Sequence, residues 1–196
     1  MSGIDRVTPT LRPDGPVRGH QRWRRLLFCH YPVDAAVVAQ LLPAGLSLDT
    51  FQGQAYVGIV PFWMEGVRPR WAPEPLAFEF LETNVRTYVH VEGRDPGVYF
   101  FSLDAASRIA VTVARIGWGL PYFFADMSER EHAGETRYRV TRGGERPAAL
   151  DVRYRVGEEA GPSEPGSFQH FLVERYYLHL EKGGRLWSGR VHHPPY

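Results

Sequence analysis

The chain has 196 residues, of which 43% are hydrophobic and 13% aromatic, and this is enough to bury one substantial core. Its 23 basic residues nearly balance its 22 acidic ones, so the overall field that attracts nucleic acid or an anionic bilayer is absent. No apolar stretch is long enough to span a bilayer and no leader pattern is found, so we expect a cytoplasmic protein that binds neither nucleic acid nor membrane.

The first part of the chain predicts an arm followed by a short helix. Residues 1–21 mix Pro, Gly, Arg and Asp without periodicity, which predicts a flexible N-terminal arm ahead of a single domain over residues 22–196. We expect a strand over residues 26–30, and Asp34 can then cap a helix over residues 35–42.

The middle of the chain predicts two hairpins and a longer helix. Turn-forming residues separate four strands, expected over residues 46–51, 55–64, 78–91 and 98–103. Three prolines in residues 68–75 indicate an ordered loop between the two hairpins. A helix follows, with Asp104 as its expected cap and Gly117 and Gly119 at its end.

The last part of the chain is again rich in strands. They are expected over residues 122–127, 136–141, 149–156, 176–181 and 185–192, with a helix from Ser167 to about Arg175. About ten strands and two or three short helices predict a mainly β (α+β) protein whose largely antiparallel sheet curls or closes.

One strand separates polar from packing residues with a period of two. Glu82, Asn84, Arg86 and Tyr88 share one face, which alternation alone assigns either to solvent or to the lining of a cavity. Arg86 can bind a ligand carboxylate through two parallel hydrogen bonds from its guanidinium group. Glu82 can exchange a proton if burial raises its pKa. The alternative is a structural ion pair between Glu82 and Arg86 that braces the sheet.

Two segments resemble the acetoacetate decarboxylases. Residues 33–46 are similar to the short helix and Leu-Leu-Pro exit near the start of that family. Residues 97–101, the helix end Ala114-Arg115-Ile116 and residues 119–125 (Gly-Leu-Pro-Tyr-Phe-Phe-Ala) follow the order of its strand, its Gly-Arg-Glu helix end and its Gly-Phe-Pro-Lys-Lys-Leu-Ala segment.

The sequence resembles the YqjF-like family (DUF2071) more strongly than it resembles the decarboxylases. This family is grouped with the acetoacetate decarboxylase-like superfamily. The residues that carry this resemblance are Asn-Val-Arg-Thr-Tyr-Val at 84–89, Tyr-Phe-Phe-Ser-Leu-Asp-Ala at 99–105, Ala-Arg at 114–115 and Leu-Pro-Tyr at 120–122. The resemblance spans about residues 22–196 and implies a cone-shaped, mostly antiparallel β-barrel around a cavity, which favours the cavity position for the Glu82 face.

The resemblance does not bring the decarboxylase mechanism with it. In this alignment Tyr122 and Phe123 occupy the places of the two lysines, and Ile116 replaces the acid. Lys182 is the only lysine of the chain and lies in a predicted turn, where an amine is neither desolvated nor placed beside a cation. Tyr122 offers a phenol that can stabilise an oxyanion or act as an acid, or it is an ordinary half-buried tyrosine.

Three further residues are candidates for ligand contact, each with a structural alternative. His30 ends its strand as a possible polar cavity group, or as a histidine with ordinary structural hydrogen bonds. Arg115 can contact a ligand, or it can simply occupy a helix C-terminus, where a cation is favourable. Arg175 can support the cavity or lie at a solvated helix end. The eight histidines show no metal-ligand spacing and no phosphate-binding loop is found, so we expect neither metal nor cofactor.

Two functions of different class remain open from the sequence. The first is a binding protein that holds a small, partly apolar carbonyl or carboxylate ligand in the barrel without Schiff-base chemistry. The second is a lyase or hydrolase-type enzyme on a small carbonyl compound, with Glu82 and Tyr122 as catalytic groups. A homo-oligomer is compatible with both.

Overall fold

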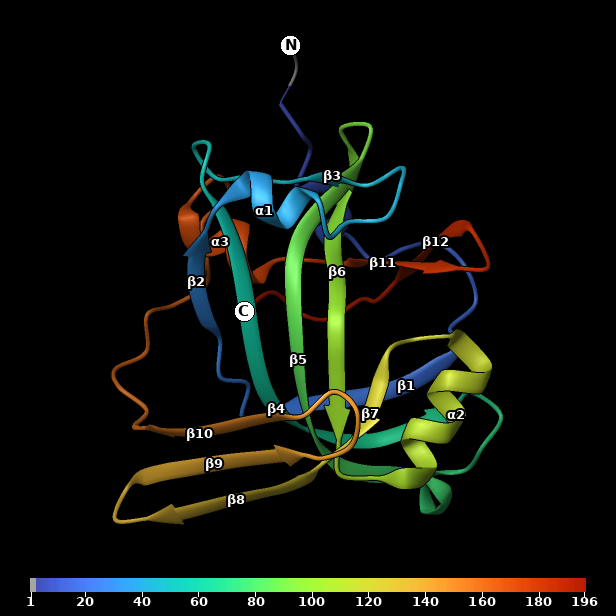
Figure 1. Cartoon of the computed structure of the whole chain (residues 1–196), viewed down its shortest axis with the longest axis vertical. Coiled ribbons are helices and arrows are strands. Elements are labelled where there is room, and N and C mark those ends of the chain that lie inside the picture. The colour runs from blue at the N-terminus through green and yellow to red at the C-terminus, as the bar shows by residue number, and fades with distance from the viewer. Residues whose placement is uncertain (1–2) are drawn as a thin grey trace.

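The computed structural model describes residues 3–196, without the side chains of residues 117 and 118. It is mostly β, with three short α-helices, as the sequence predicts (Figure 1). The strands are β1 (Gly19–Arg24), β2 (Cys29–Val33), β3 (Ser47–Leu48), β4 (Ala55–Pro69), β5 (Phe78–Val91), β6 (Arg94–Ala105), β7 (Tyr122–Phe124), β8 (Asp126–His132), β9 (Glu135–Arg142), β10 (Ala148–Tyr154), β11 (Tyr177–Lys182) and β12 (Arg185–Arg190). The helices are α1 (Ala35–Ala39), α2 (Arg108–Trp118) and α3 (Phe168–Val173), with 3₁₀ turns η1 (Thr8–Thr10) and η2 (Glu74–Leu76).

Three long antiparallel strands, β4, β5 and β6, form the centre of a nine-stranded sheet. Its main path runs β1-β4-β5-β6-β11-β12, while β2 pairs with β4, β3 with β5 and β7 with β6. The pairings of β6 with β7 and with β11 are parallel, and the others are antiparallel. Strands β8, β9 and β10 form a separate antiparallel sheet across one end of these long strands (Figure 1).

The expected closed barrel is wrong, because within residues 3–196 neither sheet closes on itself. The two ends of the main path, β1 and β12, do not pair. Instead the His193 ring lies 5.4 Å from Trp23 of β1 and stacks at 4.3 Å on Tyr176, just before β11. Pro194 and Pro195 follow, and they have no N–H with which to continue a strand ladder. Side-chain contacts therefore bridge the gap that a barrel would close by backbone pairing.

The helix caps show which local signals the sequence carries. Asp34 accepts hydrogen bonds from the N–H groups of Ala36 and Val37, as expected, and Ser167 caps α3. The expected cap Asp104 is wrong: it lies in β6, and Ser107 caps α2 by accepting from the N–H of Ala110. Ser107 directly precedes α2, so its hydroxyl reaches an N–H of the first helical turn that has no partner within the helix. Asp104 lies in β6, too far from that turn to cap it.

Several element boundaries differ from the expected ones. The strand expected over 26–30 is displaced to β2, where Pro32 fits because β2 pairs only with β4. The strand expected over 122–127 divides at Ala125, so that β7 joins the large sheet and β8 the small one. The expected arm also contributes to the fold, since Gly19 and His20 pair with β4 and Arg6 forms an ion pair with Asp49. The flexibility expected for residues 1–21 stays a prediction.

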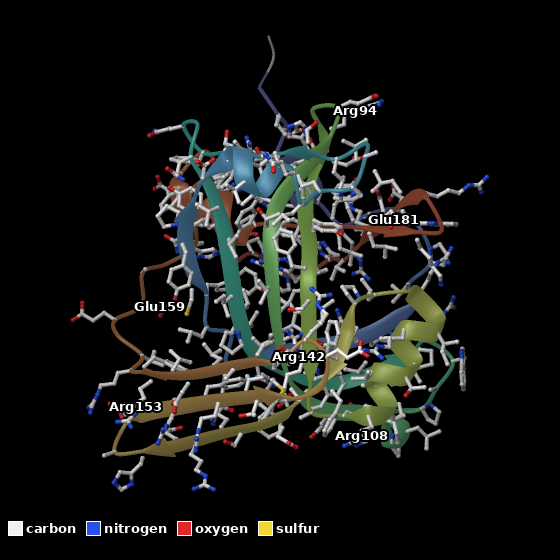
Figure 2. All side chains as sticks on the ribbon, in the orientation of Figure 1. Arg94, Arg108, Arg142, Arg153, Glu159 and Glu181 are labelled. Atoms are coloured by element: carbon white, nitrogen blue, oxygen red, sulfur yellow. The ribbon has the colours of Figure 1, made fainter. Side chains whose placement is uncertain are left out.

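The core fills both faces of the central strands. The largest buried cluster lies between β4, β5, β6, α2 and β7, a second lies under α3, and a third joins the small sheet to the large one. Among the arginines labelled in Figure 2, Arg94 lies at one end of the molecule, and Arg108 and Arg142 lie near the other, beside α2 and the small sheet.

Candidate functional site

The polar face of β5 points into the protein. We call Glu82, Asn84, Arg86 and Tyr88 the β5 row. Glu82, Asn84 and Tyr88 are at most 5% exposed, and Arg86 is half-buried. Their cross-strand neighbours on β4 and β6 include Val60, Phe62, Leu103, Ala105 and Phe100. Three polar side chains of the row are thus buried among apolar ones and the fourth is half-buried, which costs free energy unless each buried polar atom finds a partner.

At one end of the row, Glu82 accepts a hydrogen bond from the Tyr122 hydroxyl at 2.8 Å. Burial raises the pKa of the Glu82 carboxyl to about 8, and the nearby Asp104 carboxylate adds to the rise, while the Tyr122 bond opposes it. Burial and the Glu82 charge also raise the pKa of Tyr122 well above its ordinary value. Glu82 is therefore mostly protonated at neutral pH, and the pair can donate or accept a proton.

At the other end, Tyr88 and His30 are joined by a hydrogen bond of 2.6 Å between the hydroxyl and Nε2. The same hydroxyl donates to the carbonyl oxygen of Leu172 at 3.0 Å. Burial, assisted by the Arg86 charge, lowers the pKa of His30 to about 4, so its imidazole is neutral at pH 7.

The middle of the row holds polar atoms without partners. The side-chain oxygen of Asn84 and Nε of Arg86 are buried and make no hydrogen bond within the described chain. Arg86 reaches the Leu172 carbonyl with Nη2 at 3.4 Å, and its guanidinium lies 5.4 Å from the centre of the Phe28 ring. The ladder between β5 and β6 also shifts register between Val85 and Arg86, and such bulges are frequent beside functional sites.

The alternative of an ion pair between Glu82 and Arg86 is wrong. Residues i and i+4 of a strand are about 13 Å apart along its axis, too far for the two side chains to meet. Within residues 3–196, the partner of Glu82 is Tyr122 and no salt bridge holds Arg86.

The C-terminal segment, residues 191–196, covers this region. The Tyr196 ring lies 5.4 Å from Phe28, its N–H donates to Glu174, and burial raises its pKa. Neither the hollow beside α2 nor the one beside Phe51 and Phe168 is lined by residues of the β5 row. Glu82, Asn84 and Tyr88 are closed from solvent in this conformation, whereas Arg86 keeps some exposure. Sequence reasoning missed both Phe28 and Tyr196, since neither belongs to a recognisable motif.

Arg175 is buried at the far end of the row, but its charge is already paired. It donates to Asp49 at 2.7 Å and to the Phe171 carbonyl at 2.8 Å, and it lies 4.9 Å from the centre of the Tyr88 ring. One nitrogen, Nη2, has no partner. The alternative of a solvated helix end is wrong, because Arg175 is buried and paired with Asp49, 126 residues away.

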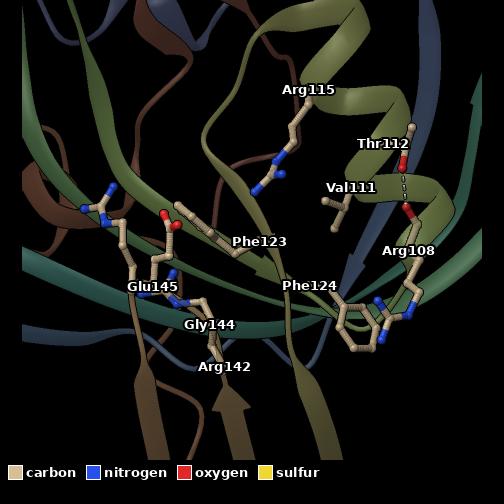
Figure 3. Close-up of a pocket in the computed structure, with 11 residues that line it drawn as sticks. Arg108, Val111, Thr112, Arg115, Phe123, Phe124, Arg142, Gly144 and Glu145 are labelled. Carbon is tan, nitrogen blue, oxygen red and sulfur yellow. Dashed lines mark hydrogen bonds between the residues drawn. The ribbon is translucent and has the colours of Figure 1, made fainter.

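Arg115 does not join the other predicted site residues. It is exposed on α2, donates through Nε to the Tyr122 carbonyl at 2.5 Å, and lines a separate surface hollow (Figure 3). Within the described residues, Lys182 likewise makes no hydrogen bond or ion pair with the row: the residue is exposed at the end of β11, and its stem lies against Gly119.

In the described part of the chain, no three His, Cys, Asp or Glu side chains lie close enough together to hold a metal ion. Of the helices between residues 3 and 196, none has the length and apolar character needed to cross a membrane.

Comparison with known proteins places the chain in a family. The model of the DUF2071 family, described as an uncharacterized conserved protein, matches residues 20–196. The chain belongs to this family. It is also 40% identical over 185 residues to the uncharacterized protein YqjF of Bacillus subtilis (strain 168), a match that covers 94% of this chain and 76% of YqjF.

Solved structures show the same fold at low identity. The enduracididine biosynthesis enzyme MppR complexed with pyruvate matches 89% of this chain and 69% of its own, with a TM-score of 0.59 and 15% identity. Acetoacetate decarboxylase from Legionella pneumophila matches 97% of this chain and 75% of its own, with a TM-score of 0.56 and 13% identity. The fold is therefore acetoacetate decarboxylase-like.

Proposed function

We propose that this protein binds a small, partly apolar carboxylate or carbonyl compound at the β5 row, without forming an imine. The observation that carries the proposal is the pair of buried, unpartnered atoms at the centre of the row, Asn84 Oδ1 and Arg86 Nε. A buried polar group without a partner costs about 1–3 kcal/mol, which a ligand or an ordered water recovers by supplying the hydrogen bond.

The chemistry of the row fits such a ligand. The Arg86 guanidinium can hold a carboxylate through two parallel hydrogen bonds. The rings of Phe28, Phe100 and Tyr88 provide apolar surface beside it. Toward the other end of the row, protonated Glu82 and the Tyr122 hydroxyl can donate to a carbonyl oxygen.

A covalent imine is not part of the proposal. Imine formation needs an amine that is neutral and sheltered, and Lys182, the only lysine, is exposed at the end of β11. Tyr122 stands where the resemblance to the decarboxylases expects a lysine, and a phenol cannot form an imine.

Ligand entry requires residues 191–196 to move. The segment contributes no strand pairing and is held at its two ends. The Val191 N–H donates to the Tyr176 carbonyl, the Tyr196 carbonyl accepts from the Ser163 N–H, and the Tyr196 N–H donates to the Glu174 carboxylate. Such a segment opens at lower free energy than a paired strand.

The proposal is tested by calorimetric titration with pyruvate, the molecule bound in the MppR structure, and with acetoacetate. We expect the wild type to bind at least one of them and Asn84→Leu to weaken binding by about fivefold or more, the scale of one buried hydrogen bond. Ser102→Ala is the matched control, since Ser102 is buried on β6 and faces the other side of the sheet, beside Val85. Equal binding by wild type and Asn84→Leu, or no binding of either compound, contradicts the proposal.

An enzymatic function is the second candidate, and the raised pKa of Glu82 is the observation that favours it. A carboxyl that titrates near pH 8 beside a phenol can remove a proton from the carbon next to a carbonyl and return it. Exchange of the pyruvate methyl protons with deuterium, followed by NMR, detects this step without a co-reactant. Exchange above the buffer rate that Glu82→Gln abolishes supports the enzyme, and no exchange by a pyruvate-binding wild type leaves the binding function.

A further inference from the structure

A hollow of about 430 Å³ opens on the surface beside α2 (Figure 3). Helix α2, the strand β7 that follows it, and the connection between β9 and β10 form it. Helix α2 contributes Arg108, Thr112 and Arg115 from one face, as the spacing of four and three residues requires. Strand β7 contributes the rings of Phe123 and Phe124, and the end of β9 with the turn that follows it contributes residues 142–146.

The charge of this hollow is strongly one-sided. Four arginines, Arg108, Arg115, Arg142 and Arg146, line it against a single acid, Glu145. Three of the guanidinium groups lie 4.4 to 5.5 Å from the centre of the Phe123 ring. The fourth, Arg108, lies 3.8 Å from the centre of Phe124. Contact with the ring faces orients these cations, but it does not remove their mutual repulsion.

The arginines differ in how far the protein itself satisfies them. Arg142 pairs with buried Asp104 at 2.8 Å, yet its Nε is buried without a partner. Arg115 donates to the Tyr122 carbonyl. For Arg108 and Arg146, which are exposed, no side-chain hydrogen bond or salt bridge is found within residues 3–196. At least two guanidinium groups are thus free to meet an external anion.

We propose that this hollow is a second binding site, specific for a compact oxyanion with two or more negative charges, such as a phosphate ester or a polycarboxylate. Guanidinium groups match the oxygen geometry of phosphate and carboxylate groups through paired hydrogen bonds. The glycines at 143 and 144 leave the turn backbone open to a close approach, because no neighbouring atom lies within 4 Å of where their Cβ atoms would be.

This site is separate from the β5 row. Tyr122 and Phe123 are neighbours on β7 and point to opposite faces, Tyr122 toward Glu82 and Phe123 toward the arginines. Binding here therefore does not depend on the function proposed for the row, and either site can fail without the other.

Calorimetry with pyrophosphate and with citrate, in low-salt buffer, tests the proposal. We expect the wild type to bind at least one of them, and the stronger of the two identifies the phosphate or the carboxylate class. The double variant Arg108→Gln/Arg146→Gln should weaken binding by about tenfold or more, because it removes two charge-assisted contacts. The control Arg153→Gln, an exposed arginine on β10 outside the hollow (Figure 2), should bind as the wild type does.

Fold is checked by the melting temperature of each variant, and if the double variant is unstable, Arg146→Gln alone decides, since it changes only an exposed turn. Absence of binding by either anion, or equal binding by wild type and variant, overturns the proposal. Tighter binding of a 12-nucleotide single-stranded RNA than of both small anions also overturns it, because the hollow would then be part of a nucleic-acid surface.

Discussion

The Tyr122 hydroxyl and the Glu82 carboxyl are hydrogen-bonded at 2.8 Å although 40 residues separate them in sequence. The contact depends on β6, which pairs with β5 through Ala105 opposite Glu82 and with β7 through Leu103 opposite Tyr122. It places a phenol beside a carboxyl in the core, and burial then raises the pKa of both groups.

Glu82 should make the protein less stable as pH rises from about 6.5 to 8. Its folded pKa of about 8 lies above the unfolded value of 4.5, so in this window the unfolded state has lost a proton that the folded state keeps. The free energy of unfolding should fall by up to about 1.4 kcal/mol per pH unit. Urea denaturation at several pH values measures this slope.

The control for this prediction is Glu82→Gln, in which the slope above pH 6.5 should disappear. Below pH 6.5 the measurement is less direct, because burial lowers the pKa values of His30, His170 and His179, whose contribution to stability is lost as pH falls. A wild type and a Glu82→Gln variant with parallel profiles between pH 6.5 and 8 would show that Glu82 is ionised in the folded state.

Arg175 should be essential for stability. Arg175→Met leaves the buried Asp49 carboxylate with only Arg6 as an ion-pair partner, and breaking a buried pair typically costs about 3–5 kcal/mol. Chemical denaturation measures the loss. The matched variant Arg137→Met removes an exposed pair with Asp151 and should leave the denaturation midpoint nearly unchanged. Similar midpoints for the two variants would contradict this assignment.

Borohydride should not trap an adduct with acetoacetate. The only lysine amine is exposed at the β11 end, where nothing shelters it in the neutral form that attacks a ketone. Intact-mass spectrometry after reduction should show the unmodified mass for the wild type and for Lys182→Ala alike. A mass increase that Lys182→Ala abolishes would restore covalent chemistry to this protein.

The Tyr196 side chain should slow ligand entry to the β5 row. Its ring lies against Phe28, beside Arg86, so Tyr196→Ala should widen access and speed association. Stopped-flow measurement of pyruvate binding should give a larger association rate constant for Tyr196→Ala than for the wild type. His192→Ala, an exposed neighbour in the same segment, serves as the control. Equal rate constants would show that the ligand enters by another route.

Local patterns in the sequence predicted most of the strands and helices and the grouping of the β5 row. The period of two on β5 correctly grouped Glu82, Asn84, Arg86 and Tyr88, because strand geometry alone decides which side chains share a face. Which face is buried was decided by the resemblance to a known fold, since both faces carry polar residues. The caps Asp34 and Ser167 were predictable for the same local reason.

Contacts between distant segments were not predictable in this way. Barrel closure depends on how the C-terminal segment meets β1, which no short pattern encodes. Asp104 looked like a cap but pairs with Arg142, and Arg175 looked like a helix end but pairs with Asp49. In each case the position of a charged side chain is decided by an ion-pair partner, 38 residues away for Asp104 and 126 residues away for Arg175. Local sequence propensity contains no information about such a partner.

The central claim is that Arg86 holds the carboxylate of a ligand in the β5 row, and calorimetry of pyruvate binding to Arg86→Lys tests it most directly. An ammonium group keeps the charge but cannot make the two parallel bonds of a guanidinium, so affinity should fall by about 1–3 kcal/mol. Arg115→Lys changes the surface hollow instead and should bind pyruvate as the wild type does. Equal affinity of wild type and Arg86→Lys, both folded, or a loss confined to Arg115→Lys, would contradict the account.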